Sequence, residues 1–266
     1  MSEIIVLIPH YNNTFKLIQS IQSIKEQITV DLLIVDDGSQ DDLLIEEDVK
    51  KAYQYGKVFI EKLHKNKGIE HALNRGLELI QKMNYKYIGR LDCGDFCHTN
   101  RFSKQLDFLK SNPNIYLLGT WANVLDLNGN LLFILKHPHL DQIIKKRMYL
   151  NSMFVHPSVV FRSSIIENVG FYPTNYKAAE DYAYFFKIIE QFEVANLPEA
   201  LLDYIIDDDS ISSTKRKLQV KNRIKVILNN FYFGFYPIYG LLRNVLLLVL
   251  SRKVTTSIKK ILTNNV

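Results

Sequence analysis

The chain has 266 residues, of which 47% are hydrophobic and 12% aromatic. A chain of this length and composition can bury a full hydrophobic core, which excludes a disordered protein. The formal net charge of +5 is uneven, because residues 210–266 hold 11 Lys or Arg and no Asp or Glu, whereas residues 1–209 carry a net charge of −6. We therefore expect an anionic partner for the C-terminal segment.

The N-terminus, MSEIIVLIPHYN, lacks the basic region, apolar core and cleavage site that a signal peptide has in that order. The chain has only two cysteines, and they lie four residues apart. Both observations favour a reducing, cytoplasmic compartment.

The first half of the chain repeats one pattern, in which a short run of Ile, Val and Leu precedes a polar cluster and then residues with helical apolar spacing. The apolar runs predict strands, and the spacing within residues 17–24 and 72–80 predicts two of the helices between them. Strands that alternate with helices indicate an α/β fold, with a mostly parallel sheet and helices on both faces. The predicted strands are residues 4–8, 32–35, 58–63 and 87–91.

A polar cluster follows each of these four predicted strands. In open α/β sheets, ligands bind in the crevice outside the carboxyl ends of the strands, where the loops converge. We therefore expect the clusters to rim one pocket. Its expected members are Tyr11, Asp36, Asp37, Lys65, Asn66, Asp92 and Asp95.

The cluster VDDGS, residues 35–39, has two interpretations. Asp and Gly are common in tight turns, which is the simpler interpretation. Alternatively, a carboxylate of this cluster accepts hydrogen bonds from a nucleobase or a ribose. Tyr11, at the end of the neighbouring strand, favours the second interpretation because its ring can stack on a base.

The stretch RLDCGDFCHTNR, residues 90–101, contains ligand types of two different metal sites. A zinc site needs four ligands, and only two cysteines and one histidine are nearby, with no second cysteine pair in the chain. Asp92 and Asp95 instead offer hard oxygens that suit Mg²⁺ or Mn²⁺ bound together with substrate phosphates. The alternative is that Asp95 caps a helix that begins near residue 99 or 100.

The second half of the chain is less regular. An Asn-Gly pair within residues 126–131, flanked by apolar runs, predicts a hairpin turn with a positive φ angle. Residues 156–162 predict a strand, and residues 178–192 predict a helix with Glu180 and Asp181 in its first turn. The helix dipole stabilises acidic residues there whatever the function, so we expect a catalytic base only if this helix reaches the same crevice.

Eight segments, taken together and in order, resemble the motifs of the inverting family-2 glycosyltransferases, which have the GT-A fold. The resemblance covers residues 3–206, and it is strongest to bacterial enzymes that extend lipooligosaccharide, O-antigen or capsule chains. The segments are VLIPHYNN (6–13), LLIVDDGSQDD (32–42), NKGIEHALNRGL (66–77), YIGRLDCGDFCHTNRFSKQLDFL (87–109), GTWANV (119–124), FVHPSVVFR (154–162), VGFYP (169–173) and AEDYAYFFKI (179–188).

This resemblance implies that a hexose is moved from a nucleoside-diphosphate sugar, which we expect to be UDP-linked, to a growing cell-surface glycan. It implies that Asp181 is the catalytic base, and that Asp92 contacts a Mg²⁺ or Mn²⁺ cofactor that stabilises the leaving group. Lys67 is expected near the phosphates, or alternatively as a solvated loop residue. The expected donor-binding residues are Pro9, Tyr11, Asp37, Lys67 and Asp92.

The chain departs from the family pattern at two places. Many members have D-A-D-D where this chain has DCGD, so Gly94 stands where those members have a carboxylate. Either Asp95 replaces that carboxylate as a metal ligand, or diphosphate and water hold most of the metal. Members also often have Tyr-Arg-x-His near the end of the catalytic domain, whereas residues 204–207 here are YIID.

Two other functions agree with parts of this pattern. A catalytically silent scaffold that binds sugar nucleotides would explain Gly94 and the missing Arg and His, but not the retained aspartates at 37, 92, 95 and 181. A sugar-nucleotide pyrophosphorylase has a related fold, but it would need a glycine-rich, basic phosphate loop after the first strand. PHYNNT is not such a loop.

The basic segment 210–266 is expected to follow the catalytic domain, residues 1–209, after a boundary near residues 207–214. Residues 231–250 are long enough to cross a membrane, but two glycines, a proline and an arginine interrupt them. Basic clusters on both sides favour helices that lie on the anionic inner face of the cytoplasmic membrane, near a lipid-linked acceptor. The alternative is a helix pair packed on the catalytic domain or across a dimer. No module for nucleic acid binding is recognisable.

Overall fold

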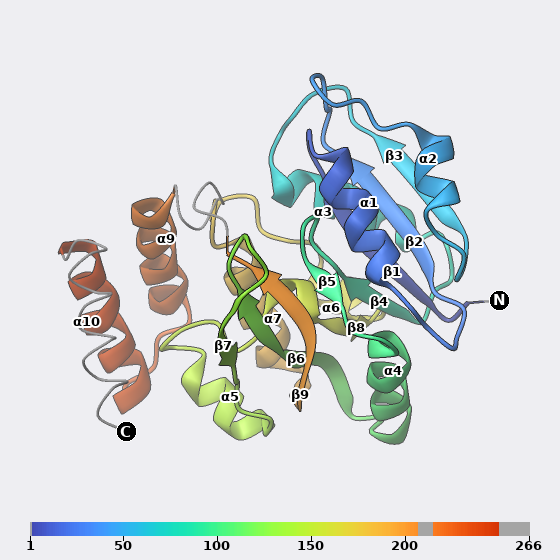
Figure 1. Ribbon diagram of the computed structural model, residues 1–266. Coiled ribbons are helices and arrows are strands. Elements are labelled where there is room, and N and C mark those ends of the chain that lie inside the picture. Colours follow the sequence, from blue (N-terminus) through green and yellow to red (C-terminus); the bar gives the residue numbers. More distant parts are fainter. Residues whose placement is uncertain (1, 207–214, 250–266) are drawn as a thin grey trace.

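The computed structural model describes residues 2–206 and 215–249. All four predicted strands of the first half are present, with helices between them (Figure 1). The elements of this half are β1 (Ile4–His10), α1 (Thr14–Ser23), β2 (Asp31–Asp36), α2 (Glu46–Lys51), β3 (Val58–Lys62), α3 (Ile69–Ile80) and β4 (Tyr87–Arg90). The predicted boundary at 207–214 and the basic residues after 250 lie outside the described residues.

The first four strands are parallel and lie in the order β3-β2-β1-β4. Every residue of β1 is buried, and its side chains alternate between the two faces of the sheet. Ile5 and Leu7 pack with residues of α3 on one face. Ile4, Val6 and Ile8 pack with residues of α1 and α2 on the other. Helices therefore cover both faces of this part of the sheet, as the sequence predicts.

The second half of the chain extends the same sheet with strands of mixed direction. Its elements are β5 (Phe96–Cys97), α4 (Arg101–Ser111), β6 (Ile115–Leu125), β7 (Leu131–Leu135), α5 (Asp141–Arg147), the 3₁₀ helix η1 (His156–Ser158), β8 (Val160–Arg162), α6 (Ile165–Val169), α7 (Glu180–Gln191) and β9 (Glu193–Ile205). The order continues β4-β8-β6-β9-β5, and β7 pairs with β6. Among the strand pairs that the structure describes in this half, only β6 and β9 are parallel. The α/β class is confirmed, and the parallel arrangement holds for the first half.

Local sequence explains two features of the second half. The predicted hairpin joins β6 to β7, with Gly129 at φ 81° and the N–H of Asp126 donating to the carbonyl of Asn130 at 3.0 Å. A connection this short can join only antiparallel strands. The strand predicted at 156–162 is shorter than expected, because Pro157 lies in η1 and has no N–H for a strand ladder.

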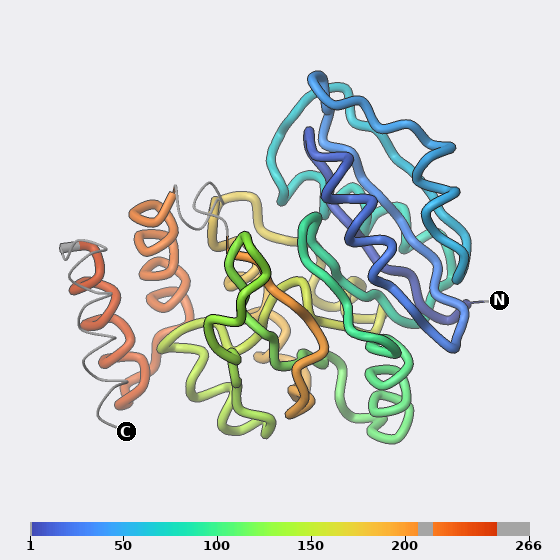
Figure 2. The backbone as a smooth tube through the Cα atoms, viewed as in Figure 1, coloured from blue at the N-terminus to red at the C-terminus, as the bar shows by residue number. Residues whose placement is uncertain are grey.

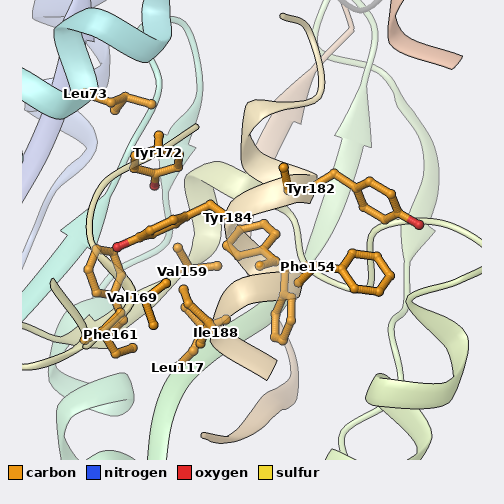
Figure 3. Close-up of a cluster of buried hydrophobic side chains, with 14 of the residues drawn as sticks. Leu73, Leu117, Phe154, Val159, Phe161, Val169, Tyr172, Tyr182, Tyr184 and Ile188 are labelled. Atoms are coloured by element: carbon orange, nitrogen blue, oxygen red, sulfur yellow. The ribbon is translucent and has the colours of Figure 1, made fainter. Parts of the chain in front are cut away.

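Helix α7 is packed into the larger of the two hydrophobic clusters (Figure 3). Tyr184 is fully buried, and its ring lies 4.2 Å from that of Tyr172, centroid to centroid. The loop before α7 is also tied to α3, because Asn74 exchanges two hydrogen bonds of 2.8 and 2.9 Å with the backbone of Tyr172. These contacts hold the start of α7 close to the helix that follows β3.

The C-terminal helices α9 (Arg216–Asn229) and α10 (Phe235–Val249) lie side by side at the opposite end of the molecule from β3 (Figure 2). Helix α9 packs against α7, and its Val226 and Ile227 are buried in the same cluster as α7. The packing of α9 on α7 agrees with the alternative of a helix pair packed on the catalytic domain. Within residues 2–206 and 215–249, every helix is too short or too polar to cross a membrane.

Candidate active site

The loops that follow β1 and β2 hold each other in place. Asp36, the last residue of β2, accepts hydrogen bonds from the backbone N–H and the hydroxyl of Ser39, at 3.1 and 2.6 Å. The Ser39 hydroxyl oxygen accepts from the N–H of Asn12 at 2.8 Å, and Asn12 Oδ1 accepts from the N–H of Gln40 at 3.0 Å. The turn interpretation of VDDGS is therefore correct for Asp36. These bonds bring the ends of β1 and β2 together, as expected.

Asp37 connects the loop after β2 to the loop before α3. Its two carboxylate oxygens accept from the N–H groups of Lys67 and Gly68, at 3.0 and 2.8 Å. The residue is 4% exposed, and burial raises its pKa although these two donors oppose the shift. Gly38 has φ 72°, and a Cβ there would lie 2.6 Å from the Cα of Lys65. The structure therefore brings Asp37, Lys65 and Lys67 together.

The other expected donor-binding residues of this rim differ in exposure. The side chain of Tyr11 is 46% exposed directly after β1, so its ring is open to a ligand. Lys67 is exposed as well. Pro9 is buried in β1 beside Val35 of β2. A direct contact between Pro9 and a donor remains a prediction.

Asp92 is oriented by a buried arginine that the sequence analysis did not include in the site. Arg90, in β4, is fully buried, and its Nη2 lies 2.5 Å from Asp92 Oδ1. Its Nη1 donates to the carbonyl of Leu7, and its Nε donates to His156 Nε2 at 3.4 Å. His156 Nε2 also lies 2.9 Å from the hydroxyl of Tyr172, and burial keeps the pKa of His156 well below its usual range. The guanidinium thus holds one oxygen of Asp92, while the Asp92 side chain is 29% exposed.

The DCGD turn has a backbone geometry that disfavours a side chain at its third position. Gly94 has φ 103°, and a Cβ there would lie 3.3 Å from the side chain of Lys16. Asp95 is 5% exposed, and its Oδ1 accepts from the N–H of Ile205 at 3.0 Å, which ties the turn to the end of β9. Burial and the nearby charge of Asp92 raise the pKa of Asp95 well above its usual range.

Asp95 does not cap the helix that follows it. Helix α4 begins at Arg101, and the N–H groups of Phe102 and Ser103 donate to the carboxylate of Glu26 at 2.8 and 3.0 Å. An acidic group at this end also suits the helix dipole. The capping alternative for Asp95 is therefore wrong, because Glu26 from the loop after α1 takes that role.

The residues of this turn fit a Mg²⁺ or Mn²⁺ ion through Asp92. Its partly exposed carboxylate offers a hard oxygen, whereas Asp95 is buried and its role as a ligand stays a prediction. The Cys93 thiol donates to the carbonyl of Asn13 at 3.4 Å, and sulfur is a soft ligand that suits neither Mg²⁺ nor Mn²⁺. Within the two described ranges, no group of three or more His, Cys, Asp or Glu could hold a metal ion. An ion on Asp92 would therefore need donor phosphates and water as its other ligands.

Two carboxylates begin α7, in the first turn as predicted. Glu180 is 7% exposed, and its Oε2 is buried without a hydrogen-bond partner among the residues that the structure describes. Burial, followed by the neighbouring Asp181, raises the pKa of Glu180 to about 8. Asp181 is half-buried and accepts from the N–H of Tyr182 at 2.7 Å. Burial raises its pKa as well.

The start of α7 and the turn after β4 belong to one site. Asp92 is close enough to raise the pKa of both Glu180 and Asp181, and Glu70 of α3 acts on Glu180 in the same way. The helix therefore reaches the crevice at the strand ends, which is the condition under which we expected a base at Asp181. This arrangement can remove a proton from a hydroxyl group that is held beside an anionic ligand.

A cation from α9 also lies at this site, and the sequence analysis missed it. The guanidinium carbon of Arg223 lies 5.7 Å from the ring centroid of Tyr182, the residue after Asp181. Arg223 opposes the effect of burial on the pKa of Asp181. The sequence analysis assigned this helix to a separate segment because of its basic charge. The signal that could have indicated packing on the catalytic domain is its apolar residues, which are buried: Val220, Val226 and Ile227.

Comparisons with known proteins agree with this geometry. The family model for Glycosyl transferase family 2 matches residues 5–170. The bifunctional glycosyltransferase pgtA of Dictyostelium discoideum is 32% identical over 226 residues, which cover 71% of this chain and 29% of that protein. The UDP-Gal:alpha-D-GlcNAc-diphosphoundecaprenol beta-1,3-galactosyltransferase of Escherichia coli is 31% identical over 173 residues, which cover 64% of this chain and 60% of that protein. The chain thus spans less than two thirds of either relative.

A solved structure has the same fold. The crystal structure of S. aureus TarS 1-349 in complex with UDP-GlcNAc aligns with a TM-score of 0.66, covering 92% of this chain and 72% of that one. The two sequences are 16% identical, so this likeness concerns the fold alone. The mixed sheet with its covering helices is therefore of the GT-A type that the sequence motifs predict.

Proposed function

We propose that this chain, which belongs to glycosyl transferase family 2, is an inverting hexosyltransferase that uses a UDP-sugar and extends a cell-surface glycan. Membership of the family makes it a glycosyltransferase that takes a sugar from a nucleotide sugar. The observation that supports the finer proposal is that the charge of Asp92, in the turn after β4, raises the pKa of Asp181 in the first turn of α7.

Asp181 fits the role of the general base. Its half-buried carboxylate has a raised pKa, which makes it a stronger base than a solvated aspartate. In the proposed reaction, Asp181 takes the proton of the acceptor hydroxyl as that oxygen attacks the anomeric carbon. The bond between the anomeric carbon and the diphosphate breaks on the opposite face, and its electron pair leaves with UDP. The configuration of the sugar is thereby inverted.

The loops after β1 and β2 supply the donor-binding surface. We assign the exposed ring of Tyr11 to stacking on the base, because it stands at the end of the strand next to Asp37. Asp37 holds the loop of Lys67 beside this surface through its two backbone acceptor contacts. The exposed ammonium group of Lys67 is then available to the diphosphate.

Asp92 would hold a divalent cation through the carboxylate oxygen that Arg90 does not occupy. When bound, Mg²⁺ or Mn²⁺ supplies positive charge that stabilises the leaving diphosphate. Arg90 keeps the carboxylate in one orientation, since its guanidinium is also bound to the carbonyl of Leu7. We retain Asp95 as the second candidate ligand, because it belongs to the same turn.

The outer face of α10 supports a location at a membrane surface. The opposite side of this helix packs on the domain, where Gly240 lies so close to Tyr149 that a Cβ would be 2.1 Å from the Tyr149 carbonyl oxygen. The exposed apolar face and the basic charge of residues 210–266 suit the anionic, cytoplasmic side of a bilayer that presents a lipid-linked acceptor. The exposed side chains of this face are Phe235, Ile238, Tyr239, Leu242, Val245 and Leu246.

Vesicle flotation tests this location. The double substitution Leu242→Asp with Val245→Asp should abolish binding to vesicles that contain phosphatidylglycerol, because it places two anions on the apolar face. Turnover of a soluble acceptor should stay unchanged, since neither residue lies at the active site. Undiminished flotation of the double variant would show that this face does not bind the bilayer.

A panel of nucleotide sugars tests the activity itself. UDP-galactose, UDP-glucose, UDP-GlcNAc and GDP-mannose are compared by thermal shift with and without Mn²⁺, and then by nucleotide release with octyl glycoside acceptors. We expect a UDP-sugar to stabilise the protein and to be turned over, with a product of inverted anomeric configuration by NMR. Gly94, which supplies no carboxylate at this position, favours one alternative, a silent scaffold. That alternative predicts donor binding without turnover.

A further inference from the structure

We propose that β7 is a docking surface for a second copy of this chain, whose own β7 pairs with it as an antiparallel strand. The dimer that results has a two-fold axis at the middle of β7 and joins the sheets of the two copies edge to edge. The inference does not depend on the proposed function, because it requires no donor, acceptor or metal ion.

Strand β7 exposes apolar side chains on both of its faces. Phe133 is 51% exposed, and its neighbours Leu132 and Ile134 are 52% and 41% exposed. Successive side chains of a strand point to opposite faces, so Phe133 lies on one face while Leu132 and Ile134 lie on the other. Residues 131–135 read LLFIL and contain no polar side chain. Exposed apolar side chains that are contiguous along a strand are typical of an interaction surface.

The backbone of β7 has one open side. Along its other side, β7 pairs antiparallel with β6, from Leu131 opposite Leu125 to Leu135 opposite Ala122. Within residues 2–206 and 215–249, no strand pairs with the open side. The N–H and C=O groups that point to that side can therefore pair with one more strand.

A second strand fits this edge better than a lipid bilayer does. A strand that lies on a bilayer buries one face, whereas both faces of β7 are apolar and exposed. The hydrocarbon of a bilayer also offers no hydrogen-bond partner to the backbone groups of an open edge. A second β7 supplies these partners and places apolar neighbours along both faces.

Symmetry and overlap set the register of the pair. In a two-fold antiparallel pair, one residue lies opposite its own counterpart, and the strands overlap completely when that residue is the central one, Phe133. Leu131 then faces Leu135 of the second copy. Just outside the strand, Asn130 faces Lys136 of the second copy. Apolar residues thus pair with apolar residues over the whole length of β7.

The same register brings opposite charges together at both ends of the pair. The carboxylate of Asp126 lies at Asn130, because its Oδ1 accepts from the Asn130 N–H at 2.9 Å and its Oδ2 from the Asn130 Nδ2 at 3.0 Å. The Nζ of Lys136 lies 5.2 Å from the ring centroid of Trp121 in its own copy. An ammonium group has three donors, so it can keep this contact and still approach Asp126 of the other copy. Charge complementarity therefore supports a second copy as the partner of β7.

Cysteine cross-linking tests the pairing and its register in the full chain. In Phe133→Cys, the two Cβ atoms of a dimer lie about 5 Å apart, so oxidation with copper phenanthroline should yield a disulfide-linked dimer on a non-reducing gel. In Leu131→Cys they are four residue spacings apart, about 14 Å, and little cross-linking is expected. The wild type, whose Cys93 is half-buried and Cys97 buried, is the control. Equal cross-linking of the two variants, or none above the wild type, overturns the proposal.

Sedimentation velocity measures the dimer without oxidation. We expect the wild type to be mostly dimeric at about 100 µM and to dissociate on dilution, because interfaces below about 1,200 Å² are typically transient. Phe133→Lys should stay monomeric, since it places two ammonium groups opposite each other. Leu43→Lys adds the same charge at another apolar position, which is 67% exposed, and should behave as the wild type. A monomeric wild type at about 100 µM, or a dimeric Phe133→Lys that unfolds at the wild-type temperature, overturns the proposal.

Two further measurements separate β7 from the membrane face proposed for α10. The double variant Leu242→Asp with Val245→Asp should keep the dimer, because α10 is not part of it. Phe133→Lys should float with phosphatidylglycerol vesicles to the same extent as the wild type. Loss of the dimer in the double variant would show that α10 carries the association, which refutes the proposal. Loss of flotation in Phe133→Lys, with a wild type that is monomeric, would show that β7 faces the bilayer instead.

Discussion

The two halves of the active site hold their carboxylates in different ways. In the first half, Asp36 accepts two hydrogen bonds from Ser39 in its own turn, Asp37 accepts two from the loop before α3, and Asp92 is paired with Arg90. At the start of α7, Glu180 has a buried oxygen without a partner among the described residues, and Asp181 accepts one bond from the N–H of the next residue. Burial raises the pKa of carboxylates in both halves, but those of the first half also order loops for a ligand, whereas those at the start of α7 do not.

This difference has a physical consequence for how each half responds to change. A carboxylate that accepts backbone N–H groups stabilises a particular loop conformation, so its removal affects folding and donor binding. A carboxylate that is desolvated beside other acids has a raised pKa, so its removal affects proton transfer and the dependence of stability on pH. Substitutions in the two halves should therefore change different observables.

The largest effect is expected for Asp181→Asn. Loss of a general base typically lowers the rate 10²–10⁴-fold, while donor binding through the first half should remain. The measurement is kcat for UDP release, together with the thermal shift caused by UDP. The comparison between the halves fails if this variant loses donor binding along with turnover.

Glu180→Gln should remove a dependence of stability on pH. The folded chain keeps a proton on Glu180 up to about pH 8, whereas a solvated glutamate loses it near pH 4.5. The folded state therefore binds more protons within this window, and the free energy of unfolding falls as pH rises through it. Relative to the wild type, Glu180→Gln should gain more stability at pH 8 than at pH 5 in urea unfolding. Glu190→Gln, at an exposed position of the same helix, should show no such gain.

Asp37→Ala should destabilise the chain by about 1–3 kcal/mol, because two backbone N–H groups lose their acceptor. Urea unfolding measures this change, with Asp107→Ala at an exposed position of α4 as the control. Stabilisation by UDP should also decrease, since the loop of Lys67 is released. A variant that is as stable as the control would contradict the ordering role of Asp37.

Gly94→Asp is expected to have the smallest effect. The positive φ angle should cost about 1–2 kcal/mol, and Gly94→Ala should cost a similar amount. Because a side chain at this φ angle is strained and meets Lys16, we do not expect the new carboxylate to reach the ion, and Mn²⁺ should activate the variant no better than the wild type. Activity measured against Mn²⁺ concentration checks this. An increase in the apparent affinity for Mn²⁺ would contradict this expectation. It would show that the missing carboxylate, and not the backbone geometry, limits metal binding by this turn.

The sequence predicted the parts of this molecule that depend on local pattern. Apolar runs followed by polar clusters identified β1 to β4 and placed Asp37 and Asp92 at one edge, because each strand carries its loop at its carboxyl end. Contacts between residues that lie far apart in the sequence were not predicted. Glu26 caps a helix 76 residues further along the chain, and Arg223 meets the helix of Asp181 only through the packing of α9 on α7.

Burial was also beyond the reach of the sequence. Asp95 and Asp92 look equivalent in DCGD, yet Asp95 is buried and accepts from the N–H of Ile205, the last residue of β9, whereas Asp92 is partly exposed. The sequence likewise shows that Gly94 is not an acid, but not that its φ angle is 103°. For Asp95 the deciding factor is the path of β9, a strand that is distant in sequence.

The docking of α9, whose Asn222 and Asn229 donate hydrogen bonds to the loop before α7, matters for chimeric enzymes. Exchanging everything after residue 206 between relatives would be a natural way to redirect such an enzyme to another surface. Here that exchange would also replace Arg223 and the side chains that hold the loop before α7. A graft that keeps α9 and replaces only the outward face of α10 would leave the catalytic centre intact.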